Sequence, residues 1–326
     1  MVEVEKLTKY YGHLAAIKDI SFRVESGEIV GFLGPNGAGK TTTMRILTCF
    51  SPASSGKATI MGVDAREDSM KIRRQLGYLP EHVPLYEWMR VGAYLDFAAR
   101  AKAVASATRQ KEIDRVAEAV GISTVSGMLI RNLSKGYRQR VGLAQALIGN
   151  PPIMILDEPT IGLDPKQIRE IRNLIKGFSR NRTVILSTHI LPEVSQICDR
   201  VIIINKGTIV AEDTPRNLIQ SHGKLSRCEL VVGAPEDEVR QMLSGFQAIN
   251  SVRLTPVPEN GRVSAFIEAA SQPDLCPALA RAVTEKGWDL FEMRPLHATL
   301  EDVFIDLVTE ETEEVSAQET DGKEVA

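Results

Sequence analysis

The segment that most restricts the fold is a glycine-rich loop between an apolar strand and a helix. The loop is Gly34-Pro35-Asn36-Gly37-Ala38-Gly39-Lys40-Thr41, which matches the spacing G-x-x-x-x-G-K-[ST]. Residues 28–33 before it have the pattern of a short strand, and residues 41–49 after it continue as a helix. A phosphate-binding loop requires strand, loop and helix in this order. The segment therefore predicts an α/β fold that binds a phosphate at the end of a strand.

Two residues of the loop have specific roles in nucleotide chemistry. Backbone N–H groups turn inward around phosphate oxygens where glycines allow it, and the N-terminus of the following helix adds a favourable dipole. Lys40 supplies a positive charge for the β- and γ-phosphates, and the Thr41 hydroxyl is placed to ligate Mg²⁺. A chance glycine-rich turn is the alternative, but the flanking strand and helix favour ATP or GTP binding.

A second apolar run, residues 153–156, ends in two carboxylates, Asp157 and Glu158. A buried strand of this kind delivers side chains to the carboxyl edge of a sheet, where α/β proteins bind ligands. Asp157 is predicted to hold Mg²⁺ through water, and Glu158 to polarise the attacking water as a general base. Without the glycine-rich loop, an ordinary polar strand end would be the preferred interpretation.

Between the two motifs the pattern changes to helix. From about Tyr86 to Asn150, alanine-rich stretches carry helical spacing, which predicts a helical subdomain inserted into the α/β core. Short strands are expected before it at residues 2–4 and 16–24. Further core strands are expected after it at residues 183–187 and 200–204, with a helix over residues 165–179.

A new pattern begins after Ser221. Strands are predicted at residues 228–232, 251–257, 262–268 and 289–294, with helices at 236–243, 274–286 and 300–308. The order β-α-β-β-α-β fits a ferredoxin-like split. The predicted domains are therefore a nucleotide-binding domain over residues 1–222 and a small α+β domain over 223–309. The acidic residues 310–326 lack apolar periodicity and are predicted to be a disordered tail.

Composition excludes several classes of protein. The net charge of -3 argues against nucleic acid as the main partner, because nucleic-acid-binding proteins usually carry a basic excess. The four cysteines show no C-x-x-C pairing and are interpreted as reduced thiols. The N-terminus has no signal-peptide pattern, and no apolar run approaches the roughly 18 residues of a membrane span. Any membrane role is therefore expected to come through a partner.

Four further motifs, in order along residues 2–220, resemble those of ABC ATPases. Leu133-Ser134-Lys135-Gly136-Tyr137 resembles the LSGGQ signature, and residues 157–164 (DEPTIGLD) resemble the Walker B and D-loop. Ser187-Thr188-His189 resembles the switch-histidine loop, and Tyr11-Gly12 resembles the aromatic A-loop. The resemblance implies a P-loop NTPase core of the ABC type with an inserted helical subdomain, in a cytoplasmic Mg²⁺-dependent ATPase.

The resemblance also implies roles for individual residues. Tyr11 stacks on adenine, residues 34–41 together with Thr42 cradle the triphosphate, and His189 contacts the γ-phosphate across from Glu158. Ser134 and Gly136 cap the γ-phosphate of a second subunit's ATP, and Asp164 links the two active sites. The implied assembly is a head-to-tail homodimer, or a pair of related ATPase subunits, with ATP between the subunits. Taken alone, His189 would be interpreted as a core histidine and Tyr11 as a surface aromatic.

Three positions depart from the family pattern. Glu81 stands where the Q-loop glutamine is expected; a carboxylate is a harder ligand for Mg²⁺ than an amide, yet it adds negative charge near the γ-phosphate. Lys135 replaces the first signature glycine, and Tyr137 replaces the usual glutamine. Lys135 either adds a cation near phosphate or points into solvent, and solvent is the favoured interpretation. Glu81 is included among the expected nucleotide and Mg²⁺ contacts.

Two stretches narrow the resemblance to a subgroup. Tyr78-Leu79-Pro80-Glu81-His82 and residues 300–305 (LEDVFI) resemble bacterial drug-export and gliding-motility-type ATPases, which work with separately encoded permeases. This implies an exporter, a multi-span membrane permease as partner, and a peripheral position on the inner face of the membrane. The second stretch is interpreted as a docking helix without chemistry.

Two other functions compete with a transporter subunit. A soluble ABC ATPase acting on nucleic acid or ribosomes would carry two such domains, long coiled coils or zinc motifs, and the sequence has none of these. The other alternative is a regulatory subunit that does not hydrolyse ATP. It is supported by Glu81 and Lys135, because both depart from the family pattern. The intact Lys40, Asp157 and Glu158 oppose it.

Overall fold

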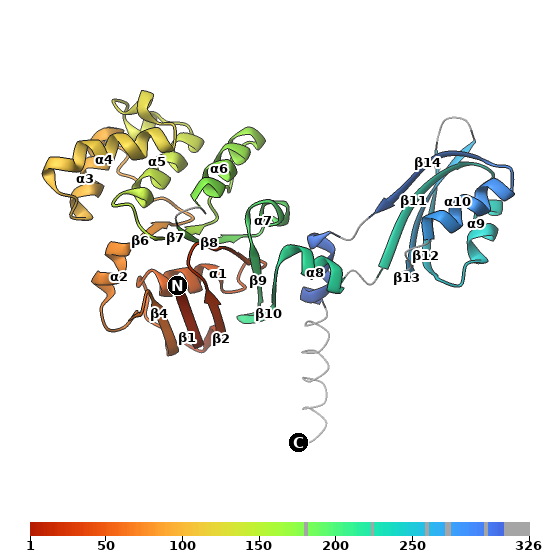
Figure 1. Cartoon of the computed structure of the whole chain (residues 1–326), viewed down its shortest axis with the longest axis horizontal. Coiled ribbons are helices and arrows are strands. Elements are labelled where there is room, and N and C mark those ends of the chain that lie inside the picture. The colour runs from red at the N-terminus through yellow and green to blue at the C-terminus, as the bar shows by residue number, and fades with distance from the viewer. Residues whose placement is uncertain (179–181, 223–224, 258–260, 271–274, 297–298, 310–326) are drawn as a thin grey trace, which may run out of the picture. The chain divides into compact units, whose positions relative to one another are not determined.

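The computed structural model describes residues 1–178, 182–222, 225–257, 261–270, 275–296 and 299–309. Two compact units make up the chain, Met1–Pro215 and Arg216–Ala326 (Figure 1). The sequence placed the boundary after residue 222, whereas in the structure all but the first residue of α8 (Pro215–His222) groups with the second unit. The predicted disordered tail, residues 310–326, lies outside the described residues.

A six-stranded sheet in the order β10-β9-β3-β8-β7-β6 forms the centre of the first unit. Its strands are β3 (Ile29–Leu33), β6 (Leu76–Leu79), β7 (Ile153–Asp157), β8 (Thr183–Thr188), β9 (Arg200–Asn205) and β10 (Thr208–Asp213). Every neighbouring pair is parallel except β10 with β9. Strands β3, β7 and β8 are buried at every residue, which explains their continuous apolar runs. The carboxyl ends of β3 and β7, which carry the two phosphate motifs, therefore lie on either side of β8.

A second sheet of the first unit is antiparallel, in the order β2-β1-β4-β5. Its strands are β1 (Val2–Tyr11), β2 (Leu14–Val24), β4 (Ser55–Ile60) and β5 (Val63–Asp64). The helices that accompany the two sheets are α1 (Lys40–Leu47), α2 (Ser69–Gln75), α6 (Pro165–Phe178) and α7 (Leu191–Ile197). One apolar core contains side chains of both sheets and of α1, including Leu7, Met44 and Ile155. This shared core fixes α1 behind the glycine-rich loop.

The helical subdomain lies between β6 and β7 in the sequence, as predicted. It contains α3 (Val91–Ala101), α4 (Ser106–Ala119) and α5 (Lys135–Leu147), with short 3₁₀ helices at Ser123–Val125 and Ile130–Asn132. Helix α5 packs closely on β6 through two glycines. A Cβ atom on Gly77 would lie 2.2 Å from the Ala146 carbonyl oxygen, and one on Gly142 would lie 2.6 Å from Val83 Cγ1. The subdomain is therefore packed directly against the edge of the central sheet.

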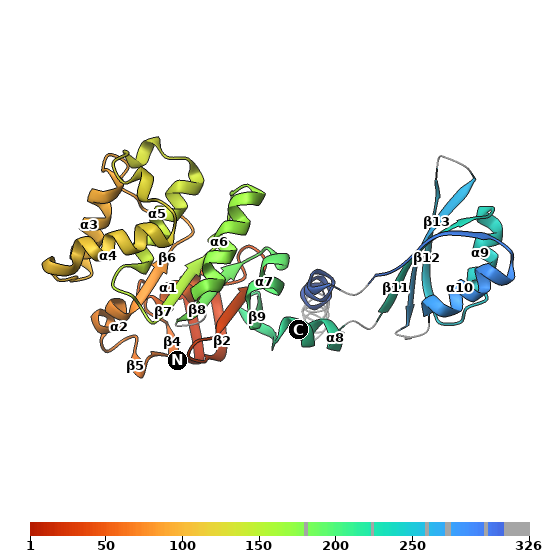
Figure 2. The same cartoon turned by 45° about the horizontal axis from the view of Figure 1, so that its top comes forward.

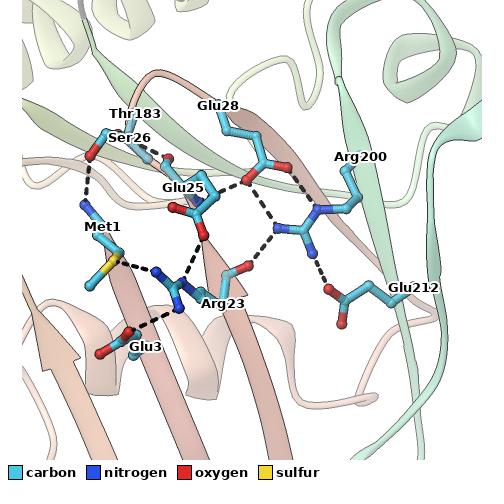
Figure 3. A network of polar contacts seen from close by, with 9 residues as sticks. All are labelled: Met1, Glu3, Arg23, Glu25, Ser26, Glu28, Thr183, Arg200 and Glu212. Atoms are coloured by element: carbon cyan, nitrogen blue, oxygen red, sulfur yellow. Dashed lines mark hydrogen bonds and ion pairs between the residues drawn. The ribbon is translucent and has the colours of Figure 1, made fainter.

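A polar network joins the two sheets at the end away from the glycine-rich loop (Figure 3). Arg200, at the start of β9, contacts both oxygens of Glu28, with Nε 2.7 Å from Oε1 and Nη2 3.0 Å from Oε2. The same guanidinium bonds Glu212 and donates to the carbonyl oxygen of Arg23 at the end of β2. Glu28 immediately precedes β3. Arg200 thus links β2, β3, β9 and β10 in one contact set.

The second unit contains a four-stranded antiparallel sheet in the order β12-β13-β11-β14. Its elements are β11 (Leu225–Gly233), α9 (Glu236–Ser244), β12 (Ile249–Val257), β13 (Arg262–Ala270), α10 (Leu275–Glu285) and β14 (Asp289–Leu296). This is the β-α-β-β-α-β order that the sequence predicted, and the fourth strand lies beside the first. Both helices lie on one face of the sheet (Figures 1 and 2). Each edge strand contains a proline, Pro256 in β12 and Pro295 in β14. Residues 300–309 are helical.

Candidate nucleotide-binding site

The glycine-rich loop connects the carboxyl end of β3 to the first residue of α1. Its geometry requires glycine at two positions: Gly39 has φ of 111°, and a Cβ on Gly34 would lie 2.3 Å from the Ile204 carbonyl oxygen. Gly39 is also the N-cap of α1, and no side chain caps this helix end. The first N–H groups of α1 therefore point at the loop without an internal side-chain partner, as an anion site needs.

Lys40 is buried and its ammonium group is satisfied within the loop. Nζ donates to the carbonyl oxygens of Gly34 at 2.8 Å and Pro35 at 3.2 Å. It also lies 3.6 Å from Glu158 Oε1, and both side chains are almost fully shielded from solvent. The cation of one motif and the carboxylate of the other thus meet at the ends of β3 and β7.

Asp157 is buried at the end of β7, with its two oxygens in different surroundings. Oδ1 accepts hydrogen bonds from the Ser187 hydroxyl and, at 3.4 Å, from the Thr41 hydroxyl. Oδ2 is buried, and no described residue bonds it. Burial raises the pKa of the Asp157 carboxyl, and the hydrogen bonds from Ser187 and Thr41 lower it. The nearby charges of Glu158 and Glu81 raise it again, and the net result is a raised pKa. An unsatisfied, dehydrated carboxylate oxygen beside a hydroxyl suits a hard cation such as Mg²⁺.

Glu158 is held in an unusual backbone conformation. Its φ is 50°, in the left-handed region, which costs free energy for a residue with a side chain. Ser187 fixes it there, because the Glu158 N–H donates to both the hydroxyl and the carbonyl oxygen of Ser187 at 3.1 Å. Oε2 of Glu158 lies 2.9 Å from His189 Nδ1, in the loop after β8. Three adjacent strands therefore bring Lys40, Glu158 and His189 into contact.

Ser187 is the site residue that sequence reasoning did not assign. It precedes the predicted His189 by two residues, so the motif Ser187-Thr188-His189 already indicated that Ser187 lies near the site. Its hydroxyl bonds the Asp157 carboxylate and accepts from the Glu158 amide, and so it orients both carboxylates.

The remaining predicted nucleotide contacts are less enclosed. Tyr11 ends β1 with its side chain exposed, and Lys9 Nζ lies 5.2 Å from the centre of its ring. Glu81 follows β6, and its Oε1 lies 3.9 Å from His82 Nδ1. The Glu81 charge raises the pKa of Asp157, although less than burial does. Among the described residues, no cluster of three or more histidine, cysteine or acidic side chains could hold a metal ion.

The signature-like segment caps α5 and lies against the D-loop-like segment of the same chain. The Ser134 hydroxyl accepts from the Tyr137 N–H at 3.4 Å. Lys135 is exposed, in line with the interpretation that it points into solvent. Its ammonium group nevertheless lies directly against Gly162, where an added Cβ would be only 1.9 Å from Lys135 Nζ. A Cβ on Gly136 would lie 2.6 Å from the Gln167 side chain. The Asp164 carboxylate in turn accepts from the backbone N–H groups at the start of α6.

Comparison with known proteins identifies the family. Residues 17–161 match the family model described as ABC transporter. The chain is 32% identical over 319 residues to the uncharacterized ABC transporter ATP-binding protein YhcH of Bacillus subtilis, covering 97% of this chain and 98% of that protein. This chain belongs to the ABC transporter ATP-binding proteins. It is also 28% identical over 308 residues to the linearmycin resistance ATP-binding protein LnrL of the same bacterium, covering 94% of this chain and 98% of that protein.

Solved structures of ABC cassettes share the fold of the first unit. The dimeric structure of the cassette MJ0796 bound to ADP and Pi has a TM-score of 0.61 and 26% identity, covering 66% of this chain and 98% of that one. As a member of this family, the chain is an ATP-binding and ATP-hydrolysing subunit of an ABC transporter. None of the helices among the described residues combines the length and the apolar character that crossing a membrane requires.

Proposed function

We propose that this ABC ATPase powers an exporter and that Lys40, Asp157, Glu158 and His189 form its hydrolytic centre. The observation that carries the proposal is the contact of Lys40 and His189 with the two oxygens of the Glu158 carboxylate. Such a buried, doubly contacted carboxylate is held in one orientation, as a general base must be. Export is supported by the names of two relatives, LnrL and the probable multidrug ABC transporter ATP-binding protein YbhF of Escherichia coli, 36% identical over 219 residues.

Asp157 and Thr41 would hold Mg²⁺, with Glu81 as a further oxygen ligand. The unbonded Asp157 Oδ2 and the Thr41 hydroxyl beside Oδ1 support this assignment. When bound, Mg²⁺ neutralises charge on the β- and γ-phosphates. The protein's own contribution is to orient the Asp157 carboxylate through the Ser187 hydroxyl and to hold the Lys40 ammonium group inside the loop where phosphate would bind.

The signature residues of a second copy complete each site in a dimer. In this proposal the loop residues 34–41 and Thr42 bind the triphosphate, Tyr11 stacks on adenine, and Ser134 and Gly136 contact ATP held by the other copy. Asp164 connects the two sites through the cap of α6. Two identical copies arranged head to tail then share two ATP molecules, and hydrolysis releases the interface.

The permease contact is assigned to residues 81–90 and the adjoining face of α3. Trp88 and Tyr86 are 75% and 54% exposed, and the Tyr86 ring centre lies 5.4 Å from that of Phe97. Exposed aromatic residues of this kind are enriched in protein interfaces. Binding there places the chain peripherally on the cytoplasmic side of a membrane.

The general base is tested by Glu158→Gln, which keeps the shape of the side chain but removes its basicity. ATP binding should persist, and turnover should fall by about 10²-fold or more, since general bases contribute roughly 10²–10⁴. An ATP-bound dimer should then accumulate on size exclusion. Glu118→Gln, at an exposed position of α4, is the matched control. Turnover of Glu158→Gln near that of the control would reject the assignment.

The permease contact is tested by charge substitutions at Tyr86 and Met89. The purified variants should retain basal ATPase activity, because neither residue is one of the expected nucleotide or Mg²⁺ contacts and both side chains are at least partly exposed. Co-expressed with the permease encoded beside it, they should no longer sediment with membranes. Met61→Glu, at an exposed apolar position in the turn between β4 and β5, is the control. If the variants co-sediment as well as wild type, the contact lies elsewhere.

A further inference from the structure

Two cysteines that are far apart in the sequence meet inside the second unit. Cys228 belongs to β11, an interior strand of the sheet, and is fully buried. Cys276 lies in the first turn of α10 and is partly exposed. Their sulfur atoms are 3.3 Å apart, with the Cys276 thiol donating to Cys228 Sγ. The fold thus places one shielded thiol directly beneath one that solvent can reach.

The surroundings give the two thiols different reactivities. Cys228 is part of the apolar core of this unit, beside residues such as Leu230 and Leu279. Burial raises the pKa of the Cys228 thiol to about 12. A buried thiol of this kind is a poor target for a dissolved oxidant. Cys276 is the sulfur at which an oxidant arriving from solvent would react.

We propose that Cys228 and Cys276 are a modification site, at which hydrogen peroxide converts the pair to a reversible disulfide. In the first step the Cys276 sulfur attacks one oxygen of hydrogen peroxide and the O–O bond breaks. The leaving hydroxide takes up the Cys276 thiol proton as water, and Cys276 sulfenic acid remains. In the second step Cys228 sulfur attacks Cys276 sulfur. The S–O bond then breaks, and the Cys228 proton leaves with the hydroxyl group as a second water. The two thiols lose two electrons in total, and hydrogen peroxide is reduced to two waters.

The geometry makes the second step short. A disulfide has an S–S distance of about 2.05 Å, so the two sulfurs have to approach by about 1.2 Å. Cys228 is fixed by β11, which pairs with strands on both sides, so most of the movement falls to Cys276 on α10. The bond would fasten α10 to the sheet, and a dissolved thiol such as glutathione would reverse it by exchange. This inference is independent of the proposed ATP site.

The experiment uses the full-length reduced protein and hydrogen peroxide as the oxidant. After treatment, free thiols are blocked under denaturing conditions and peptides are mapped by mass spectrometry without reduction. Two of the four thiols should be lost, and Cys228 should be recovered joined to Cys276 within one chain. Cys198, which is buried in the first unit, is the internal control and should remain blockable, and Cys49 of the same unit should form no intrachain disulfide. Dithiothreitol should restore all four thiols.

Two variants separate the steps. In Cys276→Ser, Cys228 should stay reduced, since no accessible sulfur remains beside it. In Cys228→Ser, Cys276 should progress to sulfenic or sulfinic acid without forming an intrachain bond. Overoxidation of Cys276 in the wild-type protein without joining Cys228 would overturn the proposal. So would a disulfide that joins different cysteines or two chains. The wild-type measurement stands alone if either variant fails to fold.

Discussion

Two helical glycines provide a test of how α5 packs on the central sheet. Gly142 lies inside α5 and Gly177 is the second-last residue of α6, so alanine should improve helix propensity at each by up to about 1 kcal/mol. Their surroundings differ. Among the described residues outside the backbone of α6, nothing lies within 4 Å of a Cβ on Gly177, whereas a Cβ on Gly142 would meet Val83 Cγ1 at 2.6 Å and Leu79 Cδ1 at 2.8 Å.

The net effect of Gly142→Ala follows from these distances. Carbon atoms in ordinary contact are about 3.5–4.0 Å apart, so the neighbouring methyl groups would have to retreat by about 1 Å. Leu79 is buried in the edge strand and cannot turn into solvent. Overpacking of this kind typically costs about 1–3 kcal/mol. After the propensity gain, we expect Gly142→Ala to lower the free energy of unfolding by about 1–2 kcal/mol, and Gly177→Ala to raise it slightly.

Thermal unfolding followed by calorimetry can separate the two variants. The unfolding transition of the first unit is identified as the one whose Tm rises when ATP is added, because a ligand stabilises the unit that binds it. For a unit of this size, about 1 kcal/mol corresponds to a Tm shift of roughly 2–4 °C. Gly142→Ala should therefore lower Tm by about 2–8 °C, and Gly177→Ala should raise it by up to about 4 °C. An equal rise in both variants would refute the close packing of α5 on β6.

Three further predictions concern the two units. Gly77→Ala should lower the Tm of the first unit even more than Gly142→Ala, because the added Cβ would lie 2.2 Å from a backbone oxygen that cannot rotate away. Burial opposes ionisation of Glu28, but the hydrogen bonds from Arg200 and from the Glu25 N–H, together with the Arg200 charge, outweigh it and lower the pKa of Glu28. The stabilisation is therefore complete above the unfolded pKa, about 4.3, and is lost as pH falls through the lower folded value. Glu28→Gln should be less stable to urea than wild type at pH 7, and this difference should disappear in acid; a constant difference would contradict the assignment. A chain ending near Gly223 should bind ATP within about tenfold of the full protein, roughly 1.4 kcal/mol, in calorimetric titration.

The sequence predicted best those parts in which function depends on neighbouring residues in the chain. The glycine-rich loop between β3 and α1 is one continuous segment, and so is the run that leads into Asp157 and Glu158. The strands at residues 28–33, 153–156, 183–187 and 200–204 were predicted for the same reason, since their apolar runs are local. Strands β4, β5, β6 and β10 were not predicted. A two-residue strand and a four-residue edge strand containing Gly77 carry no readable periodicity, and β4 and β10 are not continuously apolar.

The contacts that assemble the site could not be predicted, because they join distant segments. The Ser187 hydroxyl meets the Asp157 carboxylate only because β7 and β8 pair in parallel with these two residues opposite each other. The left-handed backbone of Glu158 is likewise fixed by Ser187 rather than by its own sequence neighbours. The meeting of Cys228 and Cys276 depends in the same way on the packing of α10 against β11.

The prolines at the two edges of the second sheet limit the pairing of this sheet with the same sheet of another copy. An open strand edge is a template on which an identical strand of another copy can pair, and such pairing tends to grow into aggregates. A proline offers no N–H to an incoming strand, and it is tolerated in edge strands for this reason. Pro256 and Pro295 therefore interrupt the outer edges of β12 and β14. The accessory sheet therefore has two edges along which an identical strand cannot pair without interruption.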